Sequence, residues 1–330
     1  MRSLLFPLSL TALIAACGSE PTAPHPTDSR PNSTVAAATS YTVINLGSLG
    51  SDTEPTAINN AGQVVGNSFV PEGAWHAFIW TDGVMTDLGT LGGPTSLASD
   101  INASGQVVGE STTASSQLHG FIWENGVIRN LGTLGGTTTR AWGINRWGEV
   151  VGQSTTQNGS IRAFIWRKGD MTRVPGMESF FARAWDINNA GIIVGDFRRA
   201  GSRAHAFRWK AETMRDLGTL GGATSNALAV NNAGTILGWS RTASGGTTNF
   251  LYRDGKMRNI GAISASDLGP ADQVVGTVMR NGNPFAILWQ DGVVTEIGPG
   301  WGVAMNQNGW IVIRRETATG TVAELYKPTS

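Results

Sequence analysis

A repeat of 43 residues constrains the fold of this chain more than any other feature, and its clearest copy lies between Ala77 and Gly109. The aromatic residue that closes a Phe-Ile-Trp segment recurs four times at 43 residues and then twice at 37, at Trp80, Trp123, Trp166, Trp209, Tyr252, Trp289 and Tyr326. The end of a Val-Val-Gly segment marks the same seven units, at Gly66, Gly109, Gly152, Gly195, Gly238, Gly276 and Ile313. A fixed period of this length indicates copies of one structural unit, as in a propeller or a solenoid.

Each unit contains four short segments with the composition of β-strands. In the first unit they are residues 57–59, 63–65, 77–80 and 84–88. All four are rich in β-branched, aromatic or aliphatic residues, and Gly, Asn or Asp residues bound them. No part of the repeat shows a sustained apolar period of 3.6 residues, so we expect little helix.

Two kinds of turn connect these segments. The first reads Asn59-Asn60-Ala61-Gly62, where Gly62 can adopt the positive φ that a type I turn with a G1 bulge requires. The second carries Asp82-Gly83 or a similar pair, which favours a tight hairpin. After the fourth segment an Asp or Asn precedes the Leu-Gly bend, and we expect its side chain to accept backbone hydrogen bonds there, at Asn45, Asp87, Asn130, Asp216 and Asn259.

Four antiparallel strands in about 40 residues are typical of one blade of a β-propeller. The last unit lacks a fourth strand, whereas residues 41–46 resemble a fourth strand without a unit. We therefore predict an all-β fold, a seven-bladed β-propeller of four-stranded antiparallel blades, in which the N-terminal strand 41–46 completes the last blade and closes the ring. A β-solenoid and a different blade count are the alternatives.

The N-terminal region carries an export signal. Arg2 is followed by an apolar stretch that ends in Ile14-Ala15-Ala16-Cys17, which contains the one cysteine of the chain. Because this ending resembles the bacterial lipobox, we predict a lipoprotein signal peptide at residues 1–16 and acylation of Cys17, which would anchor the chain in a lipid membrane. An ordinary signal peptide with an incidental cysteine is the alternative. By the same resemblance, Gly18 favours the outer membrane if the host is Gram-negative.

Residues 17–40 are rich in Pro, Ser and Thr, and this composition predicts an extended tether. The propeller would then occupy residues 41–330. The chain has 24 basic and 24 acidic side chains, so it lacks the basic footprint of a nucleic-acid-binding protein. No phosphate loop, catalytic triad or dinucleotide fingerprint occurs in the sequence, so we expect no cofactor.

Three carboxylates occupy one position of the predicted inner strand, at Asp100, Asp186 and Asp267. With Glu54 they could face a central channel and act as the acid and base of glycoside hydrolysis. The favoured alternative is that each accepts hydrogen bonds from turn amides or from a neighbouring blade. Three histidines also recur at one position, at His76, His119 and His205, but equivalent positions lie in different blades, so we expect no metal site.

Arginine and tryptophan residues gather in two adjacent units. Arg140 precedes Trp142, and Arg183 precedes Trp185, at one inner-strand position. The loop at residues 198–203 adds Arg198 and Arg203 on the same predicted mouth of the channel. Such residues serve in the recognition of carbohydrates, carboxylates and protein loops, so we predict a binding site here. Packing of the tryptophans between blades is the alternative.

The repeated motifs resemble the HAF family of bacterial extracellular repeat proteins. The resemblance rests on His76-Ala77-Phe78-Ile79-Trp80, on His205-Ala206-Phe207-Arg208-Trp209 and on the Asp-Leu-Gly-Thr-Leu-Gly-Gly segments, and it covers roughly residues 41–330. It departs where Arg162, Thr248 and Phe285 replace the histidine. The resemblance implies an exported repeat protein and no defined activity.

These observations predict a non-catalytic, lipid-anchored β-propeller of the cell envelope or the extracellular space. It would bind an envelope protein or a polysaccharide and act as an interaction scaffold. The alternative is a propeller hydrolase or lyase that acts on envelope or extracellular polysaccharide. A purely structural surface protein is a third possibility.

Overall fold

The computed structural model describes residues 40–177, 181–199 and 201–329. The predicted signal peptide, Cys17 and all of the predicted tether except Ser40 lie outside the described residues. Within the described ranges the chain forms 28 strands and no helix, so none of them contains a helix that could cross a membrane.

The strands follow one another in groups of four. The first half of the chain contains β1 (Tyr41–Asn45), β2 (Thr53–Ile58), β3 (Val64–Val70), β4 (Ala74–Thr81), β5 (Val84–Asp87), β6 (Gly92–Ile101), β7 (Val107–Thr113), β8 (Leu118–Glu124), β9 (Val127–Asn130), β10 (Gly135–Ile144), β11 (Val150–Thr156), β12 (Ile161–Arg167) and β13 (Asp170–Arg173). The second half contains β14 (Phe181–Ile187), β15 (Ile193–Arg198), β16 (His205–Lys210), β17 (Thr213–Gly218), β18 (Gly221–Val230), β19 (Ile236–Thr242), β20 (Thr247–Arg253), β21 (Lys256–Gly261), β22 (Ala265–Leu268), β23 (Val274–Arg280), β24 (Asn283–Gln290), β25 (Val293–Pro299), β26 (Trp301–Met305), β27 (Ile311–Thr317) and β28 (Gly320–Pro328). Each predicted strand segment therefore lies in or beside an observed strand.

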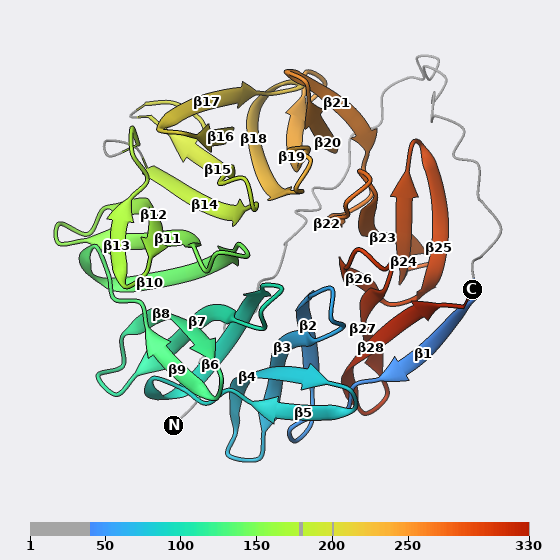
Figure 1. Cartoon of the computed structure of the whole chain (residues 1–330). Helices are drawn as coiled ribbons and strands as arrows, with labels where there is room; N and C mark the ends of the chain where they lie inside the picture. The colour runs from blue at the N-terminus through green and yellow to red at the C-terminus, as the bar shows by residue number, and fades with distance from the viewer. Residues whose placement is uncertain (1–39, 178–180, 200, 330) are drawn as a thin grey trace, which may run out of the picture. The chain divides into compact units, whose positions relative to one another are not determined.

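The strands form six hydrogen-bonded sheets around a common centre (Figure 1). Five sheets have four strands, and one has eight. The eight-stranded sheet combines β6–β9 with β10–β13 because Thr138 of β10 pairs in parallel with Leu118 of β8. The prediction of seven separate blades therefore differs from the six sheets observed, while the four-stranded antiparallel unit is confirmed.

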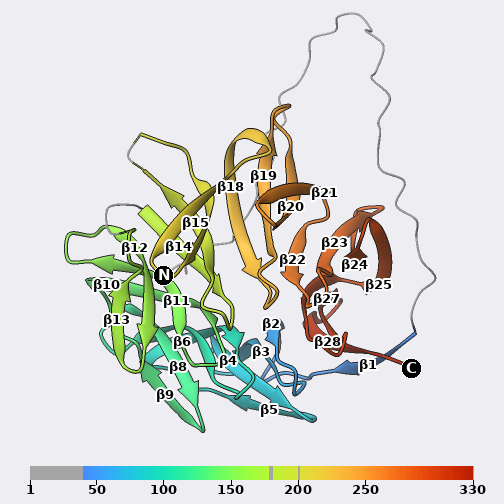
Figure 2. The same cartoon turned by 45° about the horizontal axis from the view of Figure 1, so that its top comes forward.

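The N-terminal strand closes the ring, as predicted. All five residues of β1 pair antiparallel with β28, so the sheet order is β1-β28-β27-β26. Figures 1 and 2 both show β1 along the outer side of β28. Leu46 follows β1 and is buried among residues of β4, β26 and β28, so the first segment of the propeller packs against both the first and the last unit.

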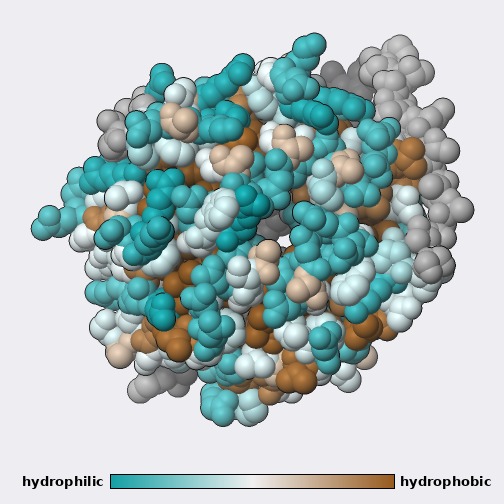
Figure 3. Space-filling view, viewed as in Figure 1, coloured by the Kyte–Doolittle hydropathy of each residue, from teal (hydrophilic) through white to brown (hydrophobic). Residues whose placement is uncertain are grey.

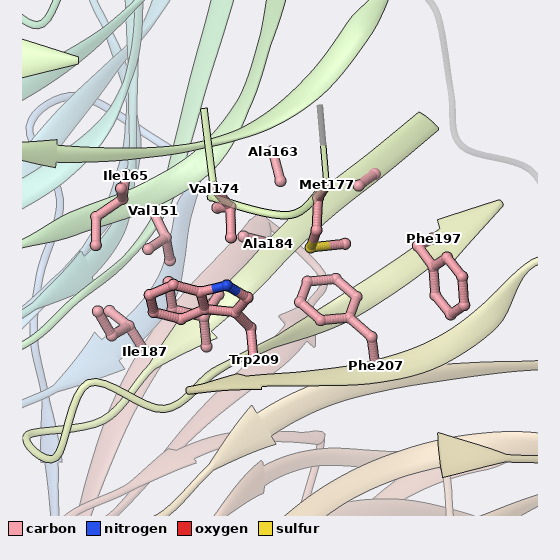
Figure 4. Packing of buried hydrophobic residues seen from close by; sticks show 12 residues of the cluster. Val151, Ala163, Ile165, Val174, Met177, Ala184, Ile187, Phe197, Phe207 and Trp209 are labelled. Atoms are coloured by element: carbon pink, nitrogen blue, oxygen red, sulfur yellow. The ribbon is translucent and has the colours of Figure 1, made fainter. Parts of the chain in front are cut away.

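The hydrophobic core lies between neighbouring units. Figure 4 shows one such layer, in which Trp209 and Phe207 of β16 lie close to Val151, Ile165 and Met177 of the preceding unit. Phenylalanines at the same position of the third strand are fully buried in five units, at Phe78, Phe121, Phe164, Phe207 and Phe250. Burying a side chain of this size stabilises the fold by about 1.5–3 kcal/mol. The repeated apolar segment therefore supplies the contact that stacks one unit on the next.

The turns have the predicted chemistry. Gly62 has a φ of 83°, and its N–H donates to the carbonyl of Asn59 at 3.0 Å. Asp82 and Gly83 have φ values of 48° and 94°, which only Gly, Asn and Asp adopt readily. In the bend after the fourth strand, the predicted side chain accepts the N–H of the second following residue at 2.7–2.8 Å in all five cases, at Asn45, Asp87, Asn130, Asp216 and Asn259.

Candidate functional site

The strands of each unit run between two faces of the ring. The turns from first to second strand, such as 59–62, and from third to fourth strand, such as 82–83, lie on one face, which we call the turn face. The connections from second to third strand, such as 71–73, lie at the opposite strand ends, on the loop face. The first strand of each unit lies nearest the centre (Figure 1), and residues at the ends of these strands line a central hollow that we call the channel.

A ring of asparagines surrounds the turn-face end of the channel. In six units the first strand is followed by an Asn whose side-chain N–H donates at 2.9–3.4 Å to the carbonyl of the equivalent residue in the next unit, from Asn59, Asn102, Asn145, Asn188, Asn231 and Asn306. The last of these bonds runs from Asn306 to Asn59 and closes the ring. Gly269 occupies the position in the remaining unit, where an added Cβ would collide with Met305. These buried amides therefore fasten six of the seven units to the unit that follows.

The turn-face mouth holds a polar cavity of about 270 Å³. Five of the six ring asparagines, all except Asn145, line it together with Asp186, Asp267 and Arg146. Figure 3 shows a narrow opening near the centre of the molecule, bordered mainly by hydrophilic side chains. The channel wall is thus suited to water and polar groups rather than to an apolar ligand.

The three recurring carboxylates lie around the channel, where Asp186 and Asp267 line the cavity, and they connect alternate pairs of units. Asp100 accepts the N–H of Ile101 at 2.7 Å and the N–H of Ile144, in the next unit, at 2.9 Å. Asp186 and Asp267 make the same two kinds of hydrogen bond, at 2.6–2.8 Å. These hydrogen bonds agree with the favoured alternative, in which each carboxylate accepts main-chain N–H groups, rather than with an acid and base of glycoside hydrolysis. The fourth candidate, Glu54, instead forms an ion pair with Arg314 of the last unit at 3.0 Å.

Burial raises the pKa of all three channel carboxyl groups. For Asp100 burial is the largest cause, the negative charge of Asp186 adds to it, and the pKa rises from 3.8 to about 8. Burial raises the pKa of Asp186 to about 6, although two main-chain N–H groups favour its ionised form. The pKa of Asp267 is raised for the same reason. The channel therefore disfavours the simultaneous ionisation of three carboxylates.

The structure brings the predicted tryptophans together. The rings of Trp142 and Trp185 stack with centroids 4.0 Å apart and planes 18° from parallel. They come from β10 and β14, the inner strands of adjacent units, so the stack joins these units beside the channel. Contact between two aromatic rings contributes about 0.5–1.5 kcal/mol beyond the burial of area.

Two carboxylates that the sequence analysis did not identify neutralise the inner arginines. The guanidinium of Arg183 donates to both oxygens of Asp196 at 2.9 and 3.0 Å, and the indole N–H of Trp185 donates to Asp196 at 2.8 Å. Arg140 forms an ion pair with Glu110 of the preceding unit at 3.3 Å. Arg183 pairs in register with Asp196, so an acidic residue on the paired strand was the signal available in the sequence.

The outer arginines differ from this inner pair. Arg198 and Arg203 are exposed and line a hollow of about 780 Å³ on the loop face, together with Phe181, Ser202 and Thr224. The Arg198 guanidinium lies 5.1 Å from the centre of the Phe181 ring. Among the described residues neither Arg198 nor Arg203 forms an ion pair with a carboxylate. We call this lining the basic hollow (Phe181, Arg198, Ser202, Arg203 and Thr224).

The recurring histidines lie far from the channel chemistry. His76 and His205 contact Asp87 and Asp216 of the fourth strand of their own units, at 2.7 and 3.0 Å between the nearest atoms, and His119 contacts Asn130. Each histidine thus fixes the bend beside its own blade. No group of three or more His, Cys, Asp or Glu side chains in the described part of the chain could hold a metal ion.

Exposed Trp147 is a feature that the sequence analysis missed. It lies in the turn between β10 and β11, on the turn face, and 64% of its surface is exposed. The equivalent positions in other units hold small or polar residues, such as Ala61, Ser104 and Ala190. The sequence did contain a signal for it, because a tryptophan stands at a turn position where the other units have small or polar residues.

No protein-family model matches the chain, and no curated protein sequence does. Solved structures do resemble its fold. The propeller domain of the trilobed protease from Pyrococcus furiosus has a TM-score of 0.59 at 11% identity, covering 84% of this chain and 96% of that one. TolB from Acinetobacter baumannii has a TM-score of 0.50 at 12% identity, covering 74% of this chain and 67% of that one.

Two further structures extend over more of the chain. An oligogalacturonate lyase in complex with manganese has a TM-score of 0.58 at 10% identity and covers 91% of this chain and 96% of that one. YCF48 bound to a D1 peptide has a TM-score of 0.52 at 9% identity, and the match covers 91% of this chain and 98% of that one. At such low identity these likenesses show the fold alone. Together with the sheet topology they establish that the chain is an all-β protein with a β-propeller fold.

Proposed function

We propose that this β-propeller is a non-catalytic binding scaffold of the bacterial envelope and that its basic hollow binds an acidic segment of a partner protein. The observation that carries the proposal is the contrast between the two sets of arginines. Arg140 and Arg183 form ion pairs with carboxylates of the protein, whereas Arg198 and Arg203 present their charge to solvent beside an aromatic ring. Arginine and aromatic side chains on a rigid frame are characteristic of protein recognition surfaces.

The inner residues support this surface rather than form it. Asp196, Arg183 and the stacked tryptophans fix the strands from which the hollow emerges. A fixed surface loses little conformational entropy on binding. A solved propeller structure with a bound peptide, that of YCF48, is a precedent for such a role within this fold.

The proposal includes export and acylation of Cys17, which rest on the sequence motif. A Cys17→Ser variant should appear outside the membrane fraction, while the native chain should incorporate a fatty acid and remain with membranes. Equal membrane association of both forms would contradict the anchor without affecting the proposed binding site.

The binding site can be tested with a labelled peptide of six glutamates and with envelope extracts. The variant Arg198→Ala with Arg203→Ala should weaken peptide binding by roughly tenfold or more and lose the same acidic partner from the extract. Lys256→Ala with Arg258→Ala is the matched control, because it removes two exposed cations from β21. Equal loss in both variants, or in neither, would reject the basic hollow. Cleavage of a polysaccharide by the native chain would instead support the hydrolase or lyase alternative.

A further inference from the structure

The turn face carries a second recognition feature, centred on Trp147. Its indole N–H donates to the carbonyl of Asn189 at 3.2 Å, which fixes the ring against the neighbouring unit. The guanidinium of Arg146 lies 4.1 Å from the ring centre. The side chain is therefore held in place, yet it remains 64% exposed. Tryptophan is enriched at interaction surfaces, because its large ring is apolar and its N–H forms a hydrogen bond.

Two hollows flank this tryptophan. One, of about 160 Å³, includes Gln106, Glu124, Arg129 and Lys168 in its wall. The other, of about 410 Å³, includes Glu149, Arg167 and Lys210. Trp147 belongs to both walls, so it forms a ridge between them. A ligand that crosses the ridge can therefore reach polar side chains on both sides.

The charges in these hollows favour an acidic ligand. Glu149 already forms an ion pair with Arg167 at 2.6 Å, and Glu124 accepts a hydrogen bond from Gln106 at 3.1 Å. Arg129, Lys168 and Lys210 are exposed, and no carboxylate pairs with them among the described residues. Both hollows thus contribute positive charge beside the aromatic ridge.

We propose that the Trp147 ridge and its two flanking hollows bind an acidic oligosaccharide. The electron-rich face of an indole attracts the C–H groups on the apolar face of a sugar ring. Lysine and arginine side chains pair with the carboxylates of uronic acids, and the glutamate and glutamine side chains accept or donate hydrogen bonds to hydroxyl groups. An extended saccharide suits two small hollows separated by a ridge better than a folded protein surface does, because such a surface needs a larger continuous area.

This site lies apart from the basic hollow. The turn at residues 188–191 and the basic hollow lie at opposite ends of β15, which has six residues. At about 3.3 Å per residue the two are separated by the length of that strand, roughly 20 Å. The two proposals can therefore fail independently.

The test uses the full chain and a hexamer of galacturonic acid, with binding measured by calorimetry. Trp147→Ala should weaken this binding roughly tenfold or more, because truncation of a central aromatic residue removes most of the energy of such a site. Ser104→Ala, which changes the same turn position of another unit, is the matched control and should bind as the native chain does. Melting curves of both variants establish that the fold is retained. Arg129→Ala with Lys168→Ala provides a second test that leaves the tryptophan in place and should also weaken binding.

Three results would overturn the proposal. These are failure of the native chain to bind the hexamer, unchanged binding by Trp147→Ala, and equally strong binding of maltohexaose, a neutral saccharide. A peptide of six glutamates should bind independently of Trp147, and its loss in Trp147→Ala would reject a saccharide in favour of a protein ligand. The variant Arg198→Ala with Arg203→Ala should bind the saccharide normally, which separates this site from the basic hollow.

Discussion

Asp196 holds the arrangement beside the loop-face end of the channel. Only 1% of its surface is exposed, and it accepts three hydrogen bonds, two from Arg183 and one from Trp185. The Arg183 side chain is itself about one-third exposed, at 35%. The buried carboxylate, rather than the arginine, is therefore the group that has no access to another partner.

Replacement of this carboxylate should destabilise the fold and loosen the tryptophan stack. Asp196→Ala would leave the Trp185 N–H without its partner and Arg183 without its counter-charge, at a cost of about 1–3 kcal/mol. The expected result is a lower melting temperature together with altered near-ultraviolet circular dichroism from the Trp142–Trp185 pair. Asp170→Ala removes an exposed carboxylate and is the control. An Asp196→Ala chain that melts like the native chain would show that the cluster is not fixed by this group.

The sequence predicted which aromatic residues meet but not how their arginines are paired. Trp142 and Trp185 occupy one repeat position in adjacent units, so the ring geometry alone brings them together. Glu110 and Asp196 occupy one position of the second strand, yet Arg140 pairs with a carboxylate of the preceding unit and Arg183 with one of its own. Arg140 pairs in register with the uncharged Gln153, whereas Arg183 pairs with Asp196, so only Arg183 has a carboxylate at this position of its own unit. The contact of Arg140 with Glu110 crosses between units and exists only once the units are arranged around the ring.

At the scale of the strands and turns, the asparagine ring connects the units. Asn102 is buried, and its side chain accepts the N–H groups of Ser104 and Gln106 while it donates to Gln106 and to the carbonyl of Asn145. One side chain thus shapes its own turn and also holds the next unit. In the unit with Gly269, the side chain of Asp272 accepts the Asn231 amide at 3.0 Å.

Loss of one such amide should weaken both its turn and the contact between units. Asn102→Ala removes the acceptor of the Ser104 and Gln106 N–H groups and the donor to the Asn145 carbonyl, and it should lower the free energy of unfolding by about 1–3 kcal/mol, measured by denaturant titration. Asn102→Asp keeps the acceptor oxygen but places a second oxygen against the Asn145 carbonyl. This variant should recover stability on acidification, when its protonated carboxyl can donate a hydrogen bond to that carbonyl. An Ala variant of native stability would contradict the role of the ring.

The hairpins and their turns could be predicted because their signals are local. Gly62 and the Asp82-Gly83 pair identify turns within a few residues, and the unit repeats them. The second role of Asn59 depends on a carbonyl 43 residues away, at Asn102, and that contact exists only once the units are arranged around a ring. Trp147 was missed for a different reason, since it falls outside the repeated motif.

At the scale of the whole molecule, the ring brings like charges together. Asp100, Asp186 and Asp267 come from alternate units, and each holds a strand of the next unit through a main-chain N–H. The closed arrangement thus concentrates three carboxylates around one channel, where burial raises the pKa of each and the negative charge of a neighbouring carboxylate adds to the rise for Asp100 and Asp186. The extra strand at residues 41–46 and the missing fourth strand of the last unit predicted that the ring closes. They did not predict that closure raises the pKa values of these carboxyl groups.

The raised pKa values imply that stability falls as the pH rises. The pKa of Asp100 is about 8 in the folded chain and near 3.8 when the chain is unfolded, so the folded state binds the proton more tightly. Its stabilising contribution is complete below about pH 4 and is lost as the pH rises towards 8, at up to about 1.4 kcal/mol per pH unit. Asp186, with a pKa of about 6, adds to the fall in the lower part of this range. The melting temperature should therefore decrease between pH 5 and pH 9.

The slope of that decrease identifies the groups responsible. Asp100→Asn cannot ionise, so its melting temperature should fall less steeply with pH, even if the loss of one hydrogen-bond acceptor lowers stability at every pH. Asp82→Asn is the control, because it changes an exposed carboxylate to a residue that suits the same turn, and it should keep the native slope. The lowered pKa of Asp272 acts in the opposite direction but only below its ordinary value of 3.8, outside this range. A native melting temperature that is constant from pH 5 to 9 would mean that the channel carboxylates are already ionised in the folded ring.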